Sequence, residues 1–173
     1  MNRDELRALQ APLKQRYRDQ PAAALVTLRA EGALGENVTC SVATGRALVE
    51  AGLHAATGGS GAFACSGDML LEALVACAGV TLSAVATALG IEVRGGRLAA
   101  EGDLDFRGTL GIGSEAPVGF RQIRLFITID SDASPGERQK LLELTHRYCV
   151  VYQTLRNGVD VQIAYRDPIP ARG

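Results

Sequence analysis

The longest regular pattern in this chain is an apolar segment that predicts a buried helix. Residues 68–89 carry only two charges, Asp68 and Glu72, and are apolar almost all the way round a helix. Such a helix needs cover on every face, and Gly90 is well placed to end it. Asp68 falls in the first turn, where a carboxylate suits the positive end of the helix dipole. One sheet from a chain of this size would not cover the whole helix, which indicates that a second subunit does.

Alternating apolar and polar positions predict strands on both sides of this helix. Residues 22–54 contain three short segments rich in Val, Leu and Thr with turn residues between them, and an antiparallel meander is the simplest arrangement. Residues 91–108 and 119–131 predict two longer strands, the second with one buried face. Residues 159–167 alternate again and predict a last strand.

Two further helices are predicted from local signals. Residues 3–19 place leucines at helical spacing among many charges, and Pro12 is expected to kink or divide this helix. The Ser-Pro-Gly-Glu sequence at 134–137 is a capping box with proline at the first helical position, and it predicts a helix that runs on through residues 141–155. The order of elements predicts an α+β fold, with helices packed against antiparallel sheet.

The length of the chain predicts its domain organisation, and its net charge limits the kinds of partner that are expected. A chain of 173 residues with 47% hydrophobic content suits one domain over residues 1–173. We expect an N-terminal helical extension at 1–21, a core at 22–166 and a tail at 167–173. The net charge of -1, from 18 basic and 19 acidic residues, offers no excess of positive charge, so neither nucleic acid nor a membrane is expected as a partner.

Targeting signals and cysteine usage point to the cytoplasm. No run of apolar residues long enough to span a membrane is free of polar interruption, and the N-terminus is charged where a signal peptide is apolar. Four cysteines, at positions 40, 65, 77 and 149, are too few for the disulfide framework of a small secreted domain. Without a Cys-x-x-Cys pair, neighbouring histidines or a glycine-rich phosphate loop, no metal and no cofactor are expected.

Two of the cysteines lie in predicted helices. The face of the central helix around Cys77 is nearly all apolar, and burial there would raise the pKa of the thiol and make the sulfur inert, so Cys77 by itself fits core packing. Chemistry at this thiol would require a cation from elsewhere. Cys149 also fits core filling, and the two thiols can meet only if their helices pack together.

Two segments resemble the signatures of the OsmC/Ohr family, the osmotically inducible proteins C and organic hydroperoxide resistance proteins. Residues 67–90, GDMLLEALVACAGVTLSAVATALG, resemble the signature in which an acidic residue, two leucines and small residues lead to a cysteine in a central helix. Residues 147–161, RYCVVYQTLRNGVDV, resemble the second signature, a helix with Cys-Pro-Val and then Thr-Leu before the last strand, with Val150 in place of the proline. The resemblance covers about residues 22–166.

This resemblance implies an α+β fold built as an intertwined homodimer, in which the central helices pack together and both active sites lie at the subunit interface. It also implies a thiol-dependent peroxidase. Cys77 would attack the O–O bond of an organic hydroperoxide, release the alcohol and become a sulfenic acid. Cys149 would condense with it to a disulfide, which an external dithiol of the lipoyl or thioredoxin type would reduce.

The same resemblance implies an arginine that holds the thiolate and a carboxylate that orients the guanidinium. Asp68 stands where part of the family carries glutamate, although a first-turn carboxylate favoured by the helix dipole explains it equally well. Arg46 and Arg29 both lie on the early strands from which the family supplies the arginine, and Arg46 is preferred. Cys65, in the loop before the central helix, is interpreted as a bystander.

A second interpretation keeps the fold and changes the function. A catalytically weak family member would bind small molecules or acyl chains in a pocket at the dimer interface, lined by Leu70, Leu74 and Phe63. Consumption of hydroperoxide distinguishes the enzyme from the binding module.

Overall fold

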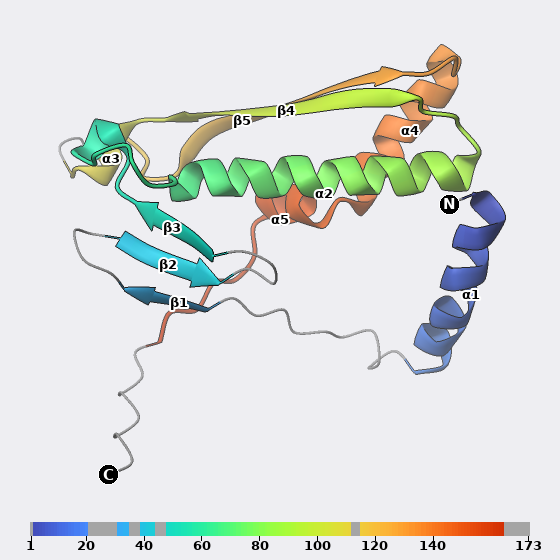
Figure 1. Ribbon diagram of the computed structural model, residues 1–173, viewed down its shortest axis with the longest axis horizontal. Helices are drawn as coiled ribbons and strands as arrows, with labels where there is room; N and C mark the ends of the chain where they lie inside the picture. The colour runs from blue at the N-terminus through green and yellow to red at the C-terminus, as the bar shows by residue number, and fades with distance from the viewer. Residues whose placement is uncertain (1, 21–30, 35–38, 44–47, 112–114, 165–173) are drawn as a thin grey trace, which may run out of the picture.

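The molecule is built around one long helix that crosses it from end to end. The computed structural model describes residues 2–20, 31–34, 39–43, 48–111 and 115–164. Figure 1 shows the helix α2 (Ser66–Leu89) along the middle, with the ribbon of β4 (Gly95–Leu104) and β5 (Phe120–Asp130) along one side of it. The helices α4 (Pro135–Tyr148) and α5 (Val150–Asn157) also pack against α2. This arrangement confirms the predicted α+β fold.

The central helix α2 confirms the predicted helix and starts slightly earlier than predicted, at Ser66, but within this chain its burial is confined to one stripe. One residue in each turn, from Leu74 to Ala86, is buried in two apolar clusters with the strands β4 and β5 and the helices α4 and α5. Gly90 ends the helix with a φ of 74°, the left-handed conformation that glycine adopts without strain. The helix therefore has one strongly buried stripe along its length.

The strands β4 and β5 form an antiparallel pair whose alternation separates an apolar face from a charged one. Leu98 lies opposite Ile127 and Ala100 opposite Leu125, and these apolar residues pack toward α2. On the other face, the guanidinium of Arg124 forms ion pairs with acidic side chains of β4. The alternation predicted for residues 119–131 therefore turns the apolar face of this strand pair toward α2 and its charged face away from it.

The early strands form the predicted meander. The strands β1 (Glu31–Leu34), β2 (Thr39–Ala43) and β3 (Leu48–Gly52) are antiparallel neighbours in that order. The first described strand begins at the end of the segment predicted for it, and residues 21–30 lie outside the described residues. A short 3-10 helix (Ala55–Thr57) and a loop then lead into α2.

The N-terminal helix is continuous through the proline that was expected to kink or divide it. The N-terminal helix α1 (Arg3–Asp19) is not divided at Pro12. Proline removes one backbone N–H, but the capping box between Asn2 and Glu5 and the remaining backbone hydrogen bonds of the helix are retained. A further short helix, α3 (Phe106–Thr109), follows β4.

The helix predicted through residues 141–155 is in fact two helices. The capping box of Ser134 and Glu137 starts α4 as predicted. At Cys149 the backbone becomes extended, with φ -73° and ψ 108°, and this residue is both the last cap of α4 and the first cap of α5. A ψ of this value takes the chain out of the helical region, so α5 begins again with its own unpaired N–H groups.

Within the described residues, the last predicted strand, at 159–167, has not formed over residues 159–164. Residues 159–164 have no strand pairing, and the apolar side chains of Val159, Val161 and Ile163 are exposed, the last of them to 96%. The alternation of a strand is present, but within the described residues no neighbouring strand supplies the backbone partners that a sheet requires.

The length and apolarity of α2 also match those of a membrane span. Its mean hydropathy reaches 2.0 over an 18-residue window, of which 22% is buried inside the protein. The central helix of a globular core passes the same test. Packing of α2 against β4, α4 and α5 favours that second interpretation.

We predict that Leu141→Ala lowers the free energy of unfolding by about 2–5 kcal/mol, because the substitution leaves a cavity beneath a fully buried side chain. Lys140→Ala, on the exposed face of the same helix, should change it by no more than about 0.5 kcal/mol. Urea unfolding followed by circular dichroism measures both values. Equal effects of the two substitutions would contradict this description of the core.

Candidate functional site

The two helical cysteines meet where α2 packs against the junction of α4 and α5. Cys149 is buried, with 1% of its surface exposed, in an apolar cluster with Leu74 and Ala78, and Cys77 packs against this cluster. The two thiols are within hydrogen-bonding reach of each other. Residues that are remote in the sequence therefore form one dithiol site.

Main-chain donors from α5 point into this site. The first N–H groups of a helix have no carbonyl partner within the helix, and the break at Cys149 places those of α5 beside the sulfurs. The N–H groups of Val151 and Val150 lower the pKa of Cys77, and those of Tyr152 and Val151 lower that of Cys149. Both sulfurs thus lie at the positive end of a helix dipole.

The donors around Cys77 favour its thiolate. Burial raises the pKa of this thiol, but hydrogen bonds from the Val151 N–H, the Cys149 thiol, the Val150 N–H and the Thr81 hydroxyl lower it, and together they outweigh burial. The pKa of Cys77 is therefore below its ordinary value. This is the condition under which a thiol becomes nucleophilic near neutral pH.

The pKa of Cys149 moves in the opposite direction. Burial raises it most, the Tyr152 N–H opposes that effect, and the hydrogen bond with Cys77 and the negative charge there raise it further. When Cys77 is ionised, Cys149 consequently keeps its proton and donates to the neighbouring sulfur. The pair has one nucleophile and one protonated partner.

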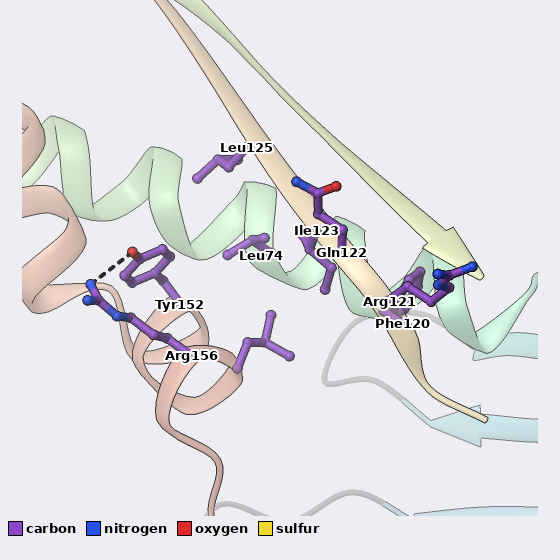
Figure 2. A pocket seen from close by; sticks show the side chains of 9 residues that line it. Leu74, Phe120, Arg121, Gln122, Ile123, Leu125, Tyr152 and Arg156 are labelled. Atoms are coloured by element: carbon purple, nitrogen blue, oxygen red, sulfur yellow. Dashed lines mark hydrogen bonds between the residues drawn. The ribbon is translucent and has the colours of Figure 1, made fainter. Parts of the chain in front are cut away.

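A cavity of about 410 Å³ opens beside the dithiol site, between α2, β5 and α5. Figure 2 shows Leu74, Leu125 and Tyr152 along its wall, and the guanidinium of Arg156 donating to the Tyr152 hydroxyl at 3.3 Å. Several residues of this wall also belong to the apolar cluster that contains Cys149 and against which Cys77 packs, namely Leu74, Ile123, Leu125, Tyr152 and Leu155. The cavity and the thiols therefore share a wall that is mainly apolar.

The other predicted site residues lie apart from this centre or outside the described residues. Asp68 is exposed in the first turn of α2 and lines a different cavity with His54 and Cys65. Arg29 and Arg46 fall in segments 21–30 and 44–47, outside the described residues. The roles of the arginine and the carboxylate stay predictions.

Within this chain the residues predicted to line the pocket of a binding module do not share one cavity, and the pocket at a dimer interface stays a prediction. Leu74 lines the cavity beside the thiols, whereas Leu70 lines another cavity at the start of α2. Phe63 packs instead against the backbone of Gly52. Within the described residues, no group of three or more His, Cys, Asp or Glu is placed to hold a metal ion.

Sequence reasoning looked for a cation beside Cys77 and missed the main-chain donors. A helix that continued through Cys149 would have used its N–H groups internally, so the break had to be known first. The available signal was at position 150: a valine there keeps the N–H that proline lacks.

Fold and site together define an α+β protein with a paired-thiol centre, and comparison places it in a family. The family model described as OsmC-like protein matches residues 59–164, more than half of the chain. The chain therefore belongs to the OsmC family, as its two motifs predicted. The comparison with curated proteins gives no match.

Solved structures agree on the fold. An OsmC-like protein from Mycoplasma pneumoniae has a TM-score of 0.65 at 17% identity, covering 77% of this chain and 89% of that one. An organic hydroperoxide resistance protein OsmC from Legionella pneumophila has a TM-score of 0.61 at 21% identity, covering 80% of this chain and 96% of that one. An organic hydroperoxide resistance protein from Elizabethkingia anophelis has a TM-score of 0.61 at 20% identity, covering 78% of this chain and 91% of that one. At these identities the likeness establishes the fold.

We predict that Cys77 is alkylated by iodoacetamide with a lower pH midpoint than Cys149. The pKa of Cys77 is lowered and that of Cys149 raised, so as the pH falls, thiolate is lost from Cys149 first and from Cys77 last. Peptide mass spectrometry of the reduced protein at a series of pH values gives both midpoints. Because a midpoint depends on ionisation and not on access, the burial of Cys149 does not obscure the comparison, and coincident midpoints would contradict it.

Proposed function

We propose that this protein is a thiol-dependent peroxidase that reduces organic hydroperoxides, with Cys77 as the attacking thiol and Cys149 as the resolving one. The packing of Cys77 against the cluster that contains Cys149, with the pKa values of the two thiols moved in opposite directions, carries the proposal. Its family context supports it, because relatives of similar fold are named organic hydroperoxide resistance proteins.

The first step uses the thiolate of Cys77. Its sulfur attacks the distal oxygen of the hydroperoxide, a sulfur–oxygen bond forms and the O–O bond breaks. The alkoxide that leaves takes a proton and becomes the alcohol, and Cys77 is oxidised to a sulfenic acid. The main-chain donors of α5 favour this step because they stabilise the thiolate before it reacts.

The second step uses the proton and the sulfur of Cys149. This thiol attacks the sulfenic sulfur of Cys77, a disulfide forms and the hydroxyl leaves as water with the proton that Cys149 carried. Two electrons from an external dithiol, of the lipoyl or thioredoxin type, then restore both thiols. A reducing compartment such as the cytoplasm is the setting that this cycle requires.

The cavity beside the dithiol site suits the organic part of the substrate. Its wall is mainly apolar and includes Leu74, Leu125 and Leu155, so an alkyl or aryl group would be buried there, next to the apolar cluster that contains Cys149. Hydrogen peroxide would gain nothing from this wall. We therefore propose organic hydroperoxides as the preferred substrates.

The same cavity keeps a binding function as the second candidate. Arg156 and Arg121 line it together with the apolar residues, a combination that also fits an acyl chain with an anionic head group. In that case the protein would bind such a ligand and consume no hydroperoxide.

A homodimer is the proposed assembly. Outside its buried stripe, α2 exposes Ala73, Ala76 and Val80, the last to 73%. These residues follow one another at helical spacing and form an apolar face on a helix that carries few charged residues. A second copy of α2 packed on this face would remove it from water.

We predict that the reduced protein consumes cumene hydroperoxide in the presence of a dithiol, and that Cys77→Ser reduces this rate to the background because no nucleophile remains. Cys149→Ser should react once with substrate and accumulate the sulfenic acid, which dimedone traps for mass spectrometry. Cys65→Ser is the matched control and should keep the wild-type rate. Consumption at the background rate by every form would favour the binding function.

We predict that Val80→Glu converts the dimer to a monomer without unfolding it, because the substitution places a charge on the apolar face of α2. Light scattering after size exclusion gives the mass, and circular dichroism tests the fold. Lys140→Glu on α4 changes a charge elsewhere on the surface and should stay dimeric. A wild-type protein that is monomeric would exclude the proposed assembly.

A further inference from the structure

We propose that Arg156 is a specificity-determining residue that selects organic hydroperoxides carrying an anionic group, because its guanidinium holds that group at the cavity beside the dithiol site. The inference rests on the proposed peroxidase function and names a narrower substrate class within it. It follows from the distribution of charge and apolar surface around this cavity and from the hydrogen bond that holds the guanidinium there.

The cavity combines an apolar wall with positive charge. Its apolar residues come from α2, β5 and α5, and Arg121 and Arg156 line it as well. Among the described residues, no aspartate or glutamate lines it. Figure 2 shows Arg156 on α5 and Arg121 at the start of β5, with Leu74 and Ile123 between them in this view. Such a wall favours a ligand that is mainly apolar and carries one anionic group.

The two arginines differ in how far neighbouring carboxylates neutralise them. The guanidinium of Arg121 lies 3.8 Å from the carboxylate of Asp105. Asp105 also pairs with Arg107, which pairs in turn with Glu115, so the charges in this group balance. Arg156 forms no ion pair with any residue that the structure describes. Its charge is therefore the one that an anionic ligand would neutralise.

Tyr152 holds the guanidinium of Arg156 at the cavity. The two residues are four positions apart on α5, so their side chains lie on one face of the helix. Nη1 of Arg156 donates to the Tyr152 hydroxyl at 3.3 Å (Figure 2). The ring of Tyr152 packs against the cluster that contains Cys149 and stacks on the ring of His146, with centroids 5.0 Å apart. A neutral hydroxyl leaves the guanidinium charged and most of its N–H groups available to a ligand.

The position of this guanidinium suits the recognition of an acidic substrate. A guanidinium is planar and always charged, and two of its N–H groups match the two oxygens of a carboxylate. A ligand whose anionic group meets Arg156 would lay its apolar part against Leu74 and Leu155, and both leucines belong to the cluster around Cys149. A neutral hydroperoxide would use the apolar wall alone. Charge would thus decide between hydroperoxides of similar size.

The experiment compares two substrates that are nearly equal in size and differ in charge: cumene hydroperoxide with a para-carboxylate, and the same compound with a para-carboxamide. Consumption by the full-length reduced protein with a dithiol gives kcat/KM for each. We expect Arg156→Gln to lower the ratio of carboxylate to carboxamide about fivefold, the effect of losing one ion pair at an exposed guanidinium. Added salt should lower the same ratio in the wild type, because it screens this interaction.

Arg147→Gln is the matched control. It removes the same charge from the neighbouring helix α4, and the guanidinium of Arg147 lies over the ring of Tyr148, 5.4 Å from its centroid, outside the cavity wall. This variant should keep the wild-type ratio. A ratio that stays the same in a folded Arg156→Gln overturns the inference. Should that variant not fold, a wild-type ratio that does not respond to salt overturns it instead.

Binding of para-isopropylbenzoate, which has no O–O bond, separates this inference from the proposed function. Calorimetry should show binding to the reduced wild type and about fivefold weaker binding to Arg156→Gln. A protein that binds the benzoate in this way but consumes neither hydroperoxide would end the peroxidase proposal and leave the anion site at Arg156. A protein that consumes both hydroperoxides with a ratio independent of Arg156 would keep the peroxidase and overturn the role of this residue.

Discussion

The structure depends on a break in one helix at Cys149. A buried thiolate loses the stabilisation that water gives it, and the N–H groups at the start of α5 replace part of that stabilisation at the sulfur of Cys77. An uninterrupted helix would have used those groups for its own hydrogen bonds. The site therefore exists because the backbone leaves the helical region for a single residue.

The rest of the molecule keeps this junction in place. The helix α2 carries Cys77, and its buried stripe packs with β5 on one side and with α4 and α5 on the other. Solved OsmC-type structures share this fold at identities of 17–21%. A fold can be kept at such low identity because many combinations of apolar side chains fill a core of the same volume.

Predictions from the sequence succeeded for features that are stabilised by interactions between residues close in the chain, and were less successful for the others. The end of α2 at Gly90, the capping box of Ser134 and the alternation along β5 each involve neighbours within a few residues, and each was predicted. Pro12 was expected to kink or divide α1, but the helix runs through it undivided, although an interior proline removes one N–H and crowds the carbonyl four residues before it. The last strand was predicted from a sound alternation, yet a strand also requires a neighbour, which the pattern of one segment does not supply.

By itself the sequence determined most of the helices and strands, the two family motifs and the two cysteines that the motifs contain. Only the tertiary structure decided that the thiols of Cys77 and Cys149 touch, that their pKa values move in opposite directions, and that backbone N–H groups favour the thiolate of Cys77. The reason is one of range. Helix caps and alternation are set by residues close in the chain, whereas the ionisation of a thiol is set by whatever packing brings within a few ångströms of its sulfur.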